Sequence, residues 1–293
     1  MGILGALGYF RSTNTKEKLI RLVTFLSDFG LQDGYVASVK GVINICSPQT
    51  PIVDISHLIP SQNVRHAAFV LSTVVPYFPK QAVHLAVVDP GVGTNRRLLA
   101  VKTPHCFFVA PDNGILSLAL KPYISQTQLD GTVVLDKKVI AVSINNRKHI
   151  VNNPSPTFDG RDILAPAVAA LCTNMNICEL GDRVFEIKGL NISNPSWQDN
   201  ELHGEVLHID HFGNIITNIC KADLPTGEDF SIYIGNHEII GLKRTYSDKQ
   251  GLLALIQSDG YLEIALNGGS AQQEVGAKIT QEVRIKLSKE AVT

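Results

Sequence analysis

The segment Val87-Val88-Asp89-Pro90-Gly91-Val92-Gly93-Thr94-Asn95-Arg96-Arg97 places an acid and two arginines directly after an apolar run at residues 83–88. That run predicts a buried strand. Pro90 and the two glycines require a tight turn, because proline fixes φ and glycine permits positive φ. A second apolar run starts at Leu98, so Asp89 and Arg96 are expected at the carboxyl end of a strand, where open α/β sheets bind ligands. A structural turn closed by an Asp–Arg ion pair is the alternative.

Strands and helices alternate on both sides of this segment. The sequence predicts strands at 22–26, 51–55, 83–88, 98–102 and 106–109, and helices at 33–46, 61–77, 115–120 and 163–172. Ser61 or Asn63 is expected to cap the second helix. Alternation of this kind is typical of βαβ units. Residues 20–188 are therefore predicted to form an N-terminal α/β domain with a largely parallel sheet.

The pattern changes after about residue 186. Residues 189–200 are rich in Asn, Ser and Pro and predict a linker. Short strands with turn signals between them follow, which predicts a C-terminal all-β barrel or sandwich domain over 201–290. The strands are expected at 205–209, 215–219, 230–234, 237–242, 251–257, 261–266 and 283–287. Residues 1–19 are predicted to be a flexible lead-in.

Composition excludes several classes of protein. The chain has 293 residues, 44% of them hydrophobic, and a formal net charge of −1. Such a balance gives no basic footprint for nucleic acid or an anionic membrane. No run of 18 apolar residues occurs, so no transmembrane segment is predicted. Five cysteines without a CxxC pair indicate buried thiols in a reducing compartment, and a cytoplasmic location is expected.

Several acids stand at predicted strand ends or turns. Asp28 ends the first strand as Asp89 ends the third. The carboxyl ends of parallel strands share one edge of a sheet, so both carboxylates are expected to face one pocket. A surplus of acid at such a rim suits a cationic ligand. Each acid also has a structural alternative: Asp33 can cap the helix that follows it, and Asp159 can pair with Arg161.

No motif for a metal or a dinucleotide is complete. His208 and Asp210 face one side of a predicted strand while His211 points to the other, so no metal site is predicted. Gly91-x-Gly93 lacks the third glycine and the following helix of a dinucleotide fingerprint. The sequence also contains no Walker loop, no GxSxG and no HExxH.

A set of short motifs, in one order from about residue 22 to 288, carries a family resemblance. The motifs are Thr24-Phe25-Leu26-Ser27-Asp28-Phe29-Gly30, Val53-Asp54-Ile55-Ser56-His57, Val88-Asp89-Pro90-Gly91-Val92-Gly93-Thr94 with Arg96-Arg97, Pro111-Asp112-Asn113-Gly114, Thr157-Phe158-x-Gly160-Arg161-Asp162, Ile209-Asp210-x-Phe212-Gly213-Asn214 and Tyr261-Leu262-Glu263-Ile264-Ala265-x-Asn267. Together they resemble the S-adenosyl-L-methionine (SAM) hydrolases, or SAM hydroxide adenosyltransferases, which are relatives of the fluorinating and chlorinating enzymes.

The resemblance implies an N-terminal α/β domain and a C-terminal β-barrel assembled as a homotrimer. The substrate would lie between the first domain of one subunit and the second domain of its neighbour. The implied reaction is displacement of L-methionine by water at the ribose C5′ of SAM, which yields adenosine. No cofactor and no metal is implied.

Roles for single residues follow from the same resemblance. Asp28 matches the acid that holds the ribose hydroxyls, and Asn214 with Asn267-Gly268 matches the adenine end. Asp33 and Asp210 match groups around the methionine ammonium, and Ser258 matches a group near its carboxylate. The residues matched to the water-activating set are Asp89, Arg96 and Asp159.

At Asp159 the sequence departs from the family, whose hydrolases usually carry histidine there. A sulfonium leaves as a neutral thioether and needs no acid, so the demanding part of the reaction is a water held in line and relieved of a proton. A carboxylate can accept that proton, and hydrolysis is expected to persist. A halide site is disfavoured, because two carboxylates repel an anion. The alternative from another class is a non-catalytic SAM or adenosine binder.

Overall fold

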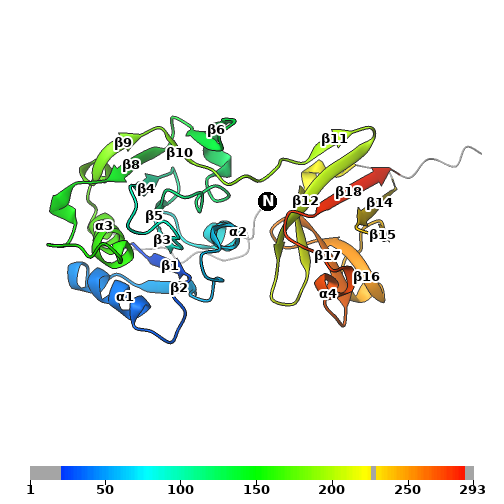
Figure 1. Ribbon diagram of the computed structural model, residues 1–293, viewed down its shortest axis with the longest axis horizontal. Coiled ribbons are helices and arrows are strands. Elements are labelled where there is room, and N and C mark those ends of the chain that lie inside the picture. The colour runs from blue at the N-terminus through cyan, green and yellow to red at the C-terminus, as the bar shows by residue number, and fades with distance from the viewer. Residues whose placement is uncertain (1–20, 226–228, 288–293) are drawn as a thin grey trace, which may run out of the picture.

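The computed structural model describes residues 21–225 and 229–287, which form two lobes joined by the segment after strand β10 (Figure 1). The lead-in predicted for residues 1–19 lies outside the described residues. The first sheet has seven strands in the order β2-β1-β3-β5-β4-β8-β9. Their bounds are β1 Val23–Ser27, β2 Ile52–Ser56, β3 Val83–Val87, β4 Leu98–Lys102, β5 Phe107–Pro111, β8 Ile140–Ile144 and β9 Gly181–Val184.

The first sheet is mixed, which corrects the prediction of a largely parallel sheet. Strands β2, β1, β3 and β5 pair in parallel, whereas β4, β8 and β9 are added as antiparallel pairs. Only residues 103–106 connect β4 to β5. A parallel crossover needs a dozen or more residues, so these neighbours can pair only in the antiparallel sense.

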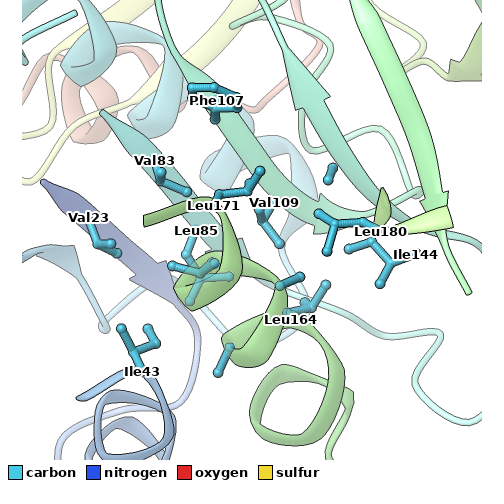
Figure 2. Close-up of a cluster of buried hydrophobic side chains, with 14 of the residues drawn as sticks. Val23, Ile43, Val83, Leu85, Phe107, Val109, Ile144, Leu164, Leu171 and Leu180 are labelled. Carbon is cyan, nitrogen blue, oxygen red and sulfur yellow. The ribbon is translucent and has the colours of Figure 1, made fainter. Parts of the chain in front are cut away.

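Helices cover one face of this sheet as the apolar periodicity predicts. Figure 2 shows Val23, Leu85 and Val109 of the parallel strands packed with Ile43 and Leu171, and all five side chains are almost fully buried. The two helices that supply Ile43 and Leu171 are α1, Tyr35–Cys46, and α3, Ala165–Cys172. A π-helix, Gly160–Leu164, precedes α3 and replaces the start of the helix predicted at 163–172.

The opposite face carries α2 (Val64–Val74) and a small sheet. Asn63 caps α2, because its side chain accepts a hydrogen bond from the His66 amide at 2.9 Å. The small sheet has the order β10-β7-β6. Its strands are β6 Ile124–Thr127, β7 Thr132–Leu135 and β10 Glu186–Lys188.

The helix predicted at 115–120 is wrong: these residues form successive turns. Ile115, Leu116 and Leu120 are buried, so the apolar pattern reports burial and not helical structure. The hydrogen bonds here mix spacings of three and four residues, from the Ser117 amide to Gly114 O and from the Leu120 amide to Leu116 O, so no regular helix forms.

The second lobe is an antiparallel, nearly closed sheet, in agreement with the predicted barrel. Its strand order is β15-β14-β18-β12-β13-β17-β16, with β11 paired to β12, and the outer strands β15 and β16 contact each other. Part of the predicted linker forms β11. The bounds are β11 Ser196–Gln198, β12 Glu201–Ile209, β13 Ile215–Cys220, β14 Phe230–Ile234, β15 His237–Ile240, β16 Gly251–Ile256, β17 Tyr261–Asn267, β18 Glu282–Leu287 and the helix α4 Ala271–Val275.

The lobes contact each other through α2 and β12. Arg65 pairs with Glu205, and the Phe69 ring stacks on His208 with centroids 4.2 Å apart. Within the described residues, no helix has the length and apolar character needed to cross a membrane.

Two buried histidines make the free energy of unfolding sensitive to acid. Burial lowers the pKa of His84 to about 4, and burial together with His66 lowers that of His208 to about 4. The unfolded chain therefore binds protons between pH 6.5 and 4 that the folded chain does not, so stability falls as pH falls. We expect a loss of roughly 2 kcal/mol per histidine between pH 7 and 5.

Urea unfolding of the His84→Gln variant at several pH values checks this expectation. The variant should show a flatter dependence of the free energy of unfolding on pH than the parent protein. His211→Gln is the matched control, because His211 is exposed. Equal slopes for the parent and His84→Gln would contradict the assignment.

Candidate active site

The segment between β3 and β4 bridges the end of β5. Strand β5 lies between β3 and β4 in the sheet, and β4 runs antiparallel to β3, so β3 ends and β4 begins at the same edge. Two contacts fix the bridge to the chain after β5: Asn113 Nδ2 donates to Val88 O at 2.8 Å, and the Asp112 amide donates to Arg97 O at 2.9 Å. The antiparallel strand that corrects the fold prediction is thus what brings Asp89 and Arg96 to one edge.

Arg96 lies between two carboxylates. Its Nε is 2.7 Å from both oxygens of Asp89, and its Nη2 contacts Asp89 Oδ2 and lies 2.6 Å from Asp159 Oδ2. The three side chains are 7% to 12% exposed. Asp159 is the N-cap residue of the π-helix, but its side chain makes no capping hydrogen bond and instead accepts one from Arg96.

Three glycines around this cluster leave little room for a side chain. A Cβ at Gly91 would lie 2.9 Å from Arg96 Cδ, and a Cβ on Gly160 would lie 3.1 Å from Val87 Cγ1. Gly93 has φ +80°, a region that L side chains rarely adopt. The glycines after Asp89 therefore let the turn close over the arginine.

The cluster carries more negative than positive charge. Burial alone would lower the pKa of Arg96, but hydrogen bonds from Arg96 to Asp89 and Asp159, and their negative charges, raise it above its ordinary value. Arg96 therefore stays a cation, and two carboxylates share one guanidinium. A site of this charge attracts cations and repels anions.

Asp28 and Asp33 lie on the loop between β1 and α1. Asp28 is half-buried, and its Oδ2 accepts a hydrogen bond from the Gln62 amide at 2.7 Å. The N-cap of α1 is Gly34, with no side-chain cap, so the capping role considered for Asp33 is absent. The Asp33 side chain is exposed.

The second lobe positions the other predicted residues. Asp210 Oδ1 accepts from the Phe212 and Asn214 amides at 2.9 and 2.8 Å, and its Oδ2 accepts from Asn214 Nδ2 at 2.9 Å. Asp210 and Ser258 line one pocket of about 520 Å³. Asn267 and Gly268 follow on β17 and the turn after it, where Asn267 Nδ2 donates to Lys249 O at 3.2 Å.

Two family models cover most of the chain: the SAM hydroxide adenosyltransferase N-terminal domain matches residues 23–181, and the C-terminal domain matches 204–284. The chain belongs to the SAM hydroxide adenosyltransferase family. Among its relatives, the (R)-S-adenosyl-L-methionine hydrolase of Thermus thermophilus is 36% identical over 91% of this chain and 100% of its own. The protein of that name from Salinispora arenicola is 34% identical over 90% and 97%.

Other relatives extend the comparison. A fluorinase from Nocardia brasiliensis is 26% identical over 91% of this chain and 97% of its own. The crystal structure of an uncharacterized conserved protein from Thermotoga maritima superposes with a TM-score of 0.78, at 35% identity over 90% of this chain and 99% of that one. The SAM hydroxide adenosyltransferase fold is therefore shared along nearly the whole chain.

Two further polar residues, Glu263 and Tyr246, line the pocket that contains Asp210 and Ser258, and the sequence predicts no role for either. Glu263, 4% exposed, accepts a hydrogen bond from Tyr246 at 2.9 Å, and both line the pocket with Asp210. Burial raises the pKa of Glu263, the charge of Asp210 raises it further, and the Tyr246 hydrogen bond lowers it. A carboxylate inside the apolar run 261–266 is a sequence signal that could have indicated Glu263 as a site residue. The sequence around Tyr246 contains no comparable signal.

The predicted site residues fall into two groups, one in each lobe. No hydrogen bond or ion pair between described residues joins Asp28, Asp89 or Asp159 to Asp210 or Ser258. A second, smaller cleft of about 350 Å³, lined mainly by residues 117–127 and 189–194, contains none of the predicted residues. In the described chain, no three His, Cys, Asp or Glu side chains are grouped as metal ligands would be.

Proposed function

We propose that the protein hydrolyses SAM to adenosine and L-methionine by attack of water at the ribose C5′. The observation that carries the proposal is the Asp89–Arg96–Asp159 cluster at the edge of the first sheet. The printed names of the relatives, (R)-S-adenosyl-L-methionine hydrolase, support this reaction and favour the (R) configuration at sulfur. We accordingly expect the (R) epimer to be the substrate.

The hydrogen bonds divide the work between the two carboxylates. Both oxygens of Asp89 are engaged by Arg96, and Oδ1 also accepts from the Gly91 amide at 3.2 Å. Asp159 accepts a hydrogen bond from Arg96 through Oδ2 alone. We assign Asp159 as the group that accepts a proton from the attacking water, because its Oδ1 keeps a free acceptor. Asp89 and Arg96 orient Asp159, and holding the attacking water in place can raise the rate by several orders of magnitude.

The departing methionine needs no help from an acid. A sulfonium leaves as a neutral thioether when water oxygen forms a bond to C5′ and the C5′–S bond breaks. The water proton passes to Asp159. The excess negative charge of the cluster favours the sulfonium cation and opposes a halide, which supports hydrolysis over halogenation.

Binding roles complete the proposal. Asp28 would hold the ribose hydroxyls, and Asn214 with Asn267 and Gly268 would contact adenine. The methionine end would meet Asp33, Asp210 and Ser258. Because these residues stand in two lobes, we propose that a site joins the first lobe of one subunit to the second lobe of its neighbour in a homotrimer.

Exposed apolar side chains beside both half-sites support such an assembly. Leu31, between Asp28 and Asp33 in the chain, is 69% exposed, and Phe212, between Asp210 and Asn214, is 75% exposed. Large apolar side chains at such places are typical of surfaces that a partner covers. A second copy of the chain would supply the missing half of each site.

Incubation of the purified protein with the separated (R) and (S) epimers of SAM, with and without chloride, tests the function. Adenosine and methionine in equal amounts from the (R) epimer, independent of chloride, are expected. A 5′-chloro nucleoside would contradict the charge argument. Intact SAM that binds but never turns over would favour the alternative, a non-catalytic SAM binder.

A further inference from the structure

A buried histidine, His57, lies outside the proposed water site. His57 follows β2, is 3% exposed, and packs its ring edge-on against Phe25 with centroids 4.6 Å apart. Its Nδ1 lies 2.7 Å from Ser27 Oγ, and Ser27 is fully buried at the end of β1. This pair therefore joins the carboxyl ends of the two neighbouring strands β1 and β2.

A carboxylate stands on the other side of the ring. His57 Nε2 is 3.1 Å from Asp54 Oδ1, although at an angle poorer than that of a regular hydrogen bond. Lys40 Nζ holds the second oxygen of Asp54 at 2.6 Å. Burial would raise the pKa of Asp54, but contacts with Lys40 and His57 lower it, so the group stays an anion. The anion favours a proton on Nε2.

The direction of each hydrogen bond follows from that proton. With Nε2 protonated, Nδ1 of His57 is an acceptor, and the Ser27 hydroxyl must donate to it. The lone pairs of Ser27 Oγ are then free for the Phe29 amide, 3.4 Å away. Asp28 is the single residue between these two anchors.

The backbone of His57 acts on the same turn. Its carbonyl accepts a hydrogen bond from the Gly30 amide at 2.8 Å. Gly30 has φ +70°, so the turn reverses just after Asp28. The chain that continues from His57 also supplies the Gln62 amide, which donates to Asp28 Oδ2 at 2.7 Å. The side chain and backbone of His57 therefore hold the residues on both sides of Asp28, and the loop that follows His57 contacts the Asp28 carboxylate itself.

We propose that His57 is a positioning residue that fixes the Asp28 carboxylate for the ribose hydroxyls, through the relay Asp54–His57–Ser27. The inference rests on the proposed ribose role of Asp28. Ser27 itself is fully buried and cannot reach a substrate, so the Ser–His–Asp grouping is not a nucleophilic triad. Its effect on the reaction passes through Asp28.

Two amide substitutions separate the halves of the relay. In His57→Asn the amide lies near the place of Nδ1 and can still accept from Ser27. In His57→Gln the amide reaches toward the place of Nε2 and Asp54 and leaves Ser27 without its acceptor. We therefore expect His57→Asn to retain ribose binding better than His57→Gln.

Calorimetric binding of two ligands gives a readout that a merely structural role would not move. The ligands are adenosine and 2′,3′-dideoxyadenosine, which lacks the hydroxyls. We expect His57→Gln to weaken adenosine about 10-fold, the size of one lost charge-assisted hydrogen bond, and to leave the dideoxy ligand within about 2-fold. His57→Asn should lose less than about 3-fold for either ligand.

His84→Gln is the matched control, because His84 is also buried on this sheet and its Nδ1 lies 2.8 Å from a β1 hydroxyl, that of Thr24. It should lower thermal stability without a preference between the ligands. Equal weakening of both ligands by His57→Gln, or equal effects of Asn and Gln at 57, would overturn the proposal. Asp28→Ala must show the same selective loss; if it does not, the ribose assignment fails and not the relay.

Discussion

Asp159→Asn is expected to lower kcat by about 10²- to 10⁴-fold, the usual contribution of a positioned general base. Asparagine keeps the shape of the side chain and an oxygen for Arg96, which donates to Asp159 at 2.6 Å. It cannot take a proton from water. KM for SAM should change little, because the assigned role is confined to the nucleophile. Steady-state release of adenosine measures both constants.

The matched variant is Asp159→His, which introduces the residue that the hydrolases this sequence resembles usually carry. Histidine accepts a proton, so we expect turnover within about 10-fold of the parent protein and a pH profile that falls as the imidazole becomes charged. Asparagine with parental kcat would remove Asp159 from the mechanism. Histidine as inactive as asparagine would show that proton acceptance at this position is not what matters.

Arg96→Met is expected to abolish measurable turnover and to cost about 3–5 kcal/mol of stability, as in other buried ion pairs that lose one partner. Methionine fills a similar volume, but Asp89 and Asp159 then face each other without a cation at side-chain exposures of 8% and 12%. Urea unfolding and product assays measure the two effects separately.

The double variant Arg96→Met/Asp89→Asn separates charge from catalysis. Removing one carboxylate relieves the repulsion, so stability should recover by more than half while turnover stays absent. An Arg96→Met protein that unfolds like the parent would show that the cluster is not held by charge. Recovery of activity in the double variant would contradict the orienting role of Arg96.

The half of the site on the β3–β4 bridge follows from local rules. Asp89 and Arg96 are seven residues apart, and Pro90, Gly91 and Gly93 leave the chain few ways to turn. Proximity along the chain makes their ion pair predictable. Asn63 as the cap of α2 follows from equally local chemistry.

Contacts between residues that are far apart in the sequence do not follow from such local rules. Asp159 binds Arg96, which lies 63 residues away in the chain. The local sequence suggests instead an ion pair between Asp159 and Arg161. Arg161 in fact pairs with the neighbouring acid, Asp162, at 2.6 Å. Only resemblance brought Asp159 to the cluster, because strand order and direction decide which loops share an edge.

Hydrophobic periodicity also cannot predict the direction of a strand. An apolar strand looks alike whether it runs parallel or antiparallel to its neighbour, and the first four residues of β4 are buried as those of β3 are. The four-residue connection 103–106 was the available signal. Strands β6, β7 and β10 have only three or four residues each, too few for an alternation of apolar and polar residues to be recognised.

The separation of Asp89, Arg96 and Asp159 from Asp210 and Ser258 has a genetic consequence. In the proposed trimer, each composite site draws on two polypeptides, so a defect in the first lobe and a defect in the second need not reside in the same site. Two alleles that are each inactive, such as Asp159→Asn and one altered at Asp210, would then complement each other when expressed together. Mixed assemblies would contain sites built from two intact halves.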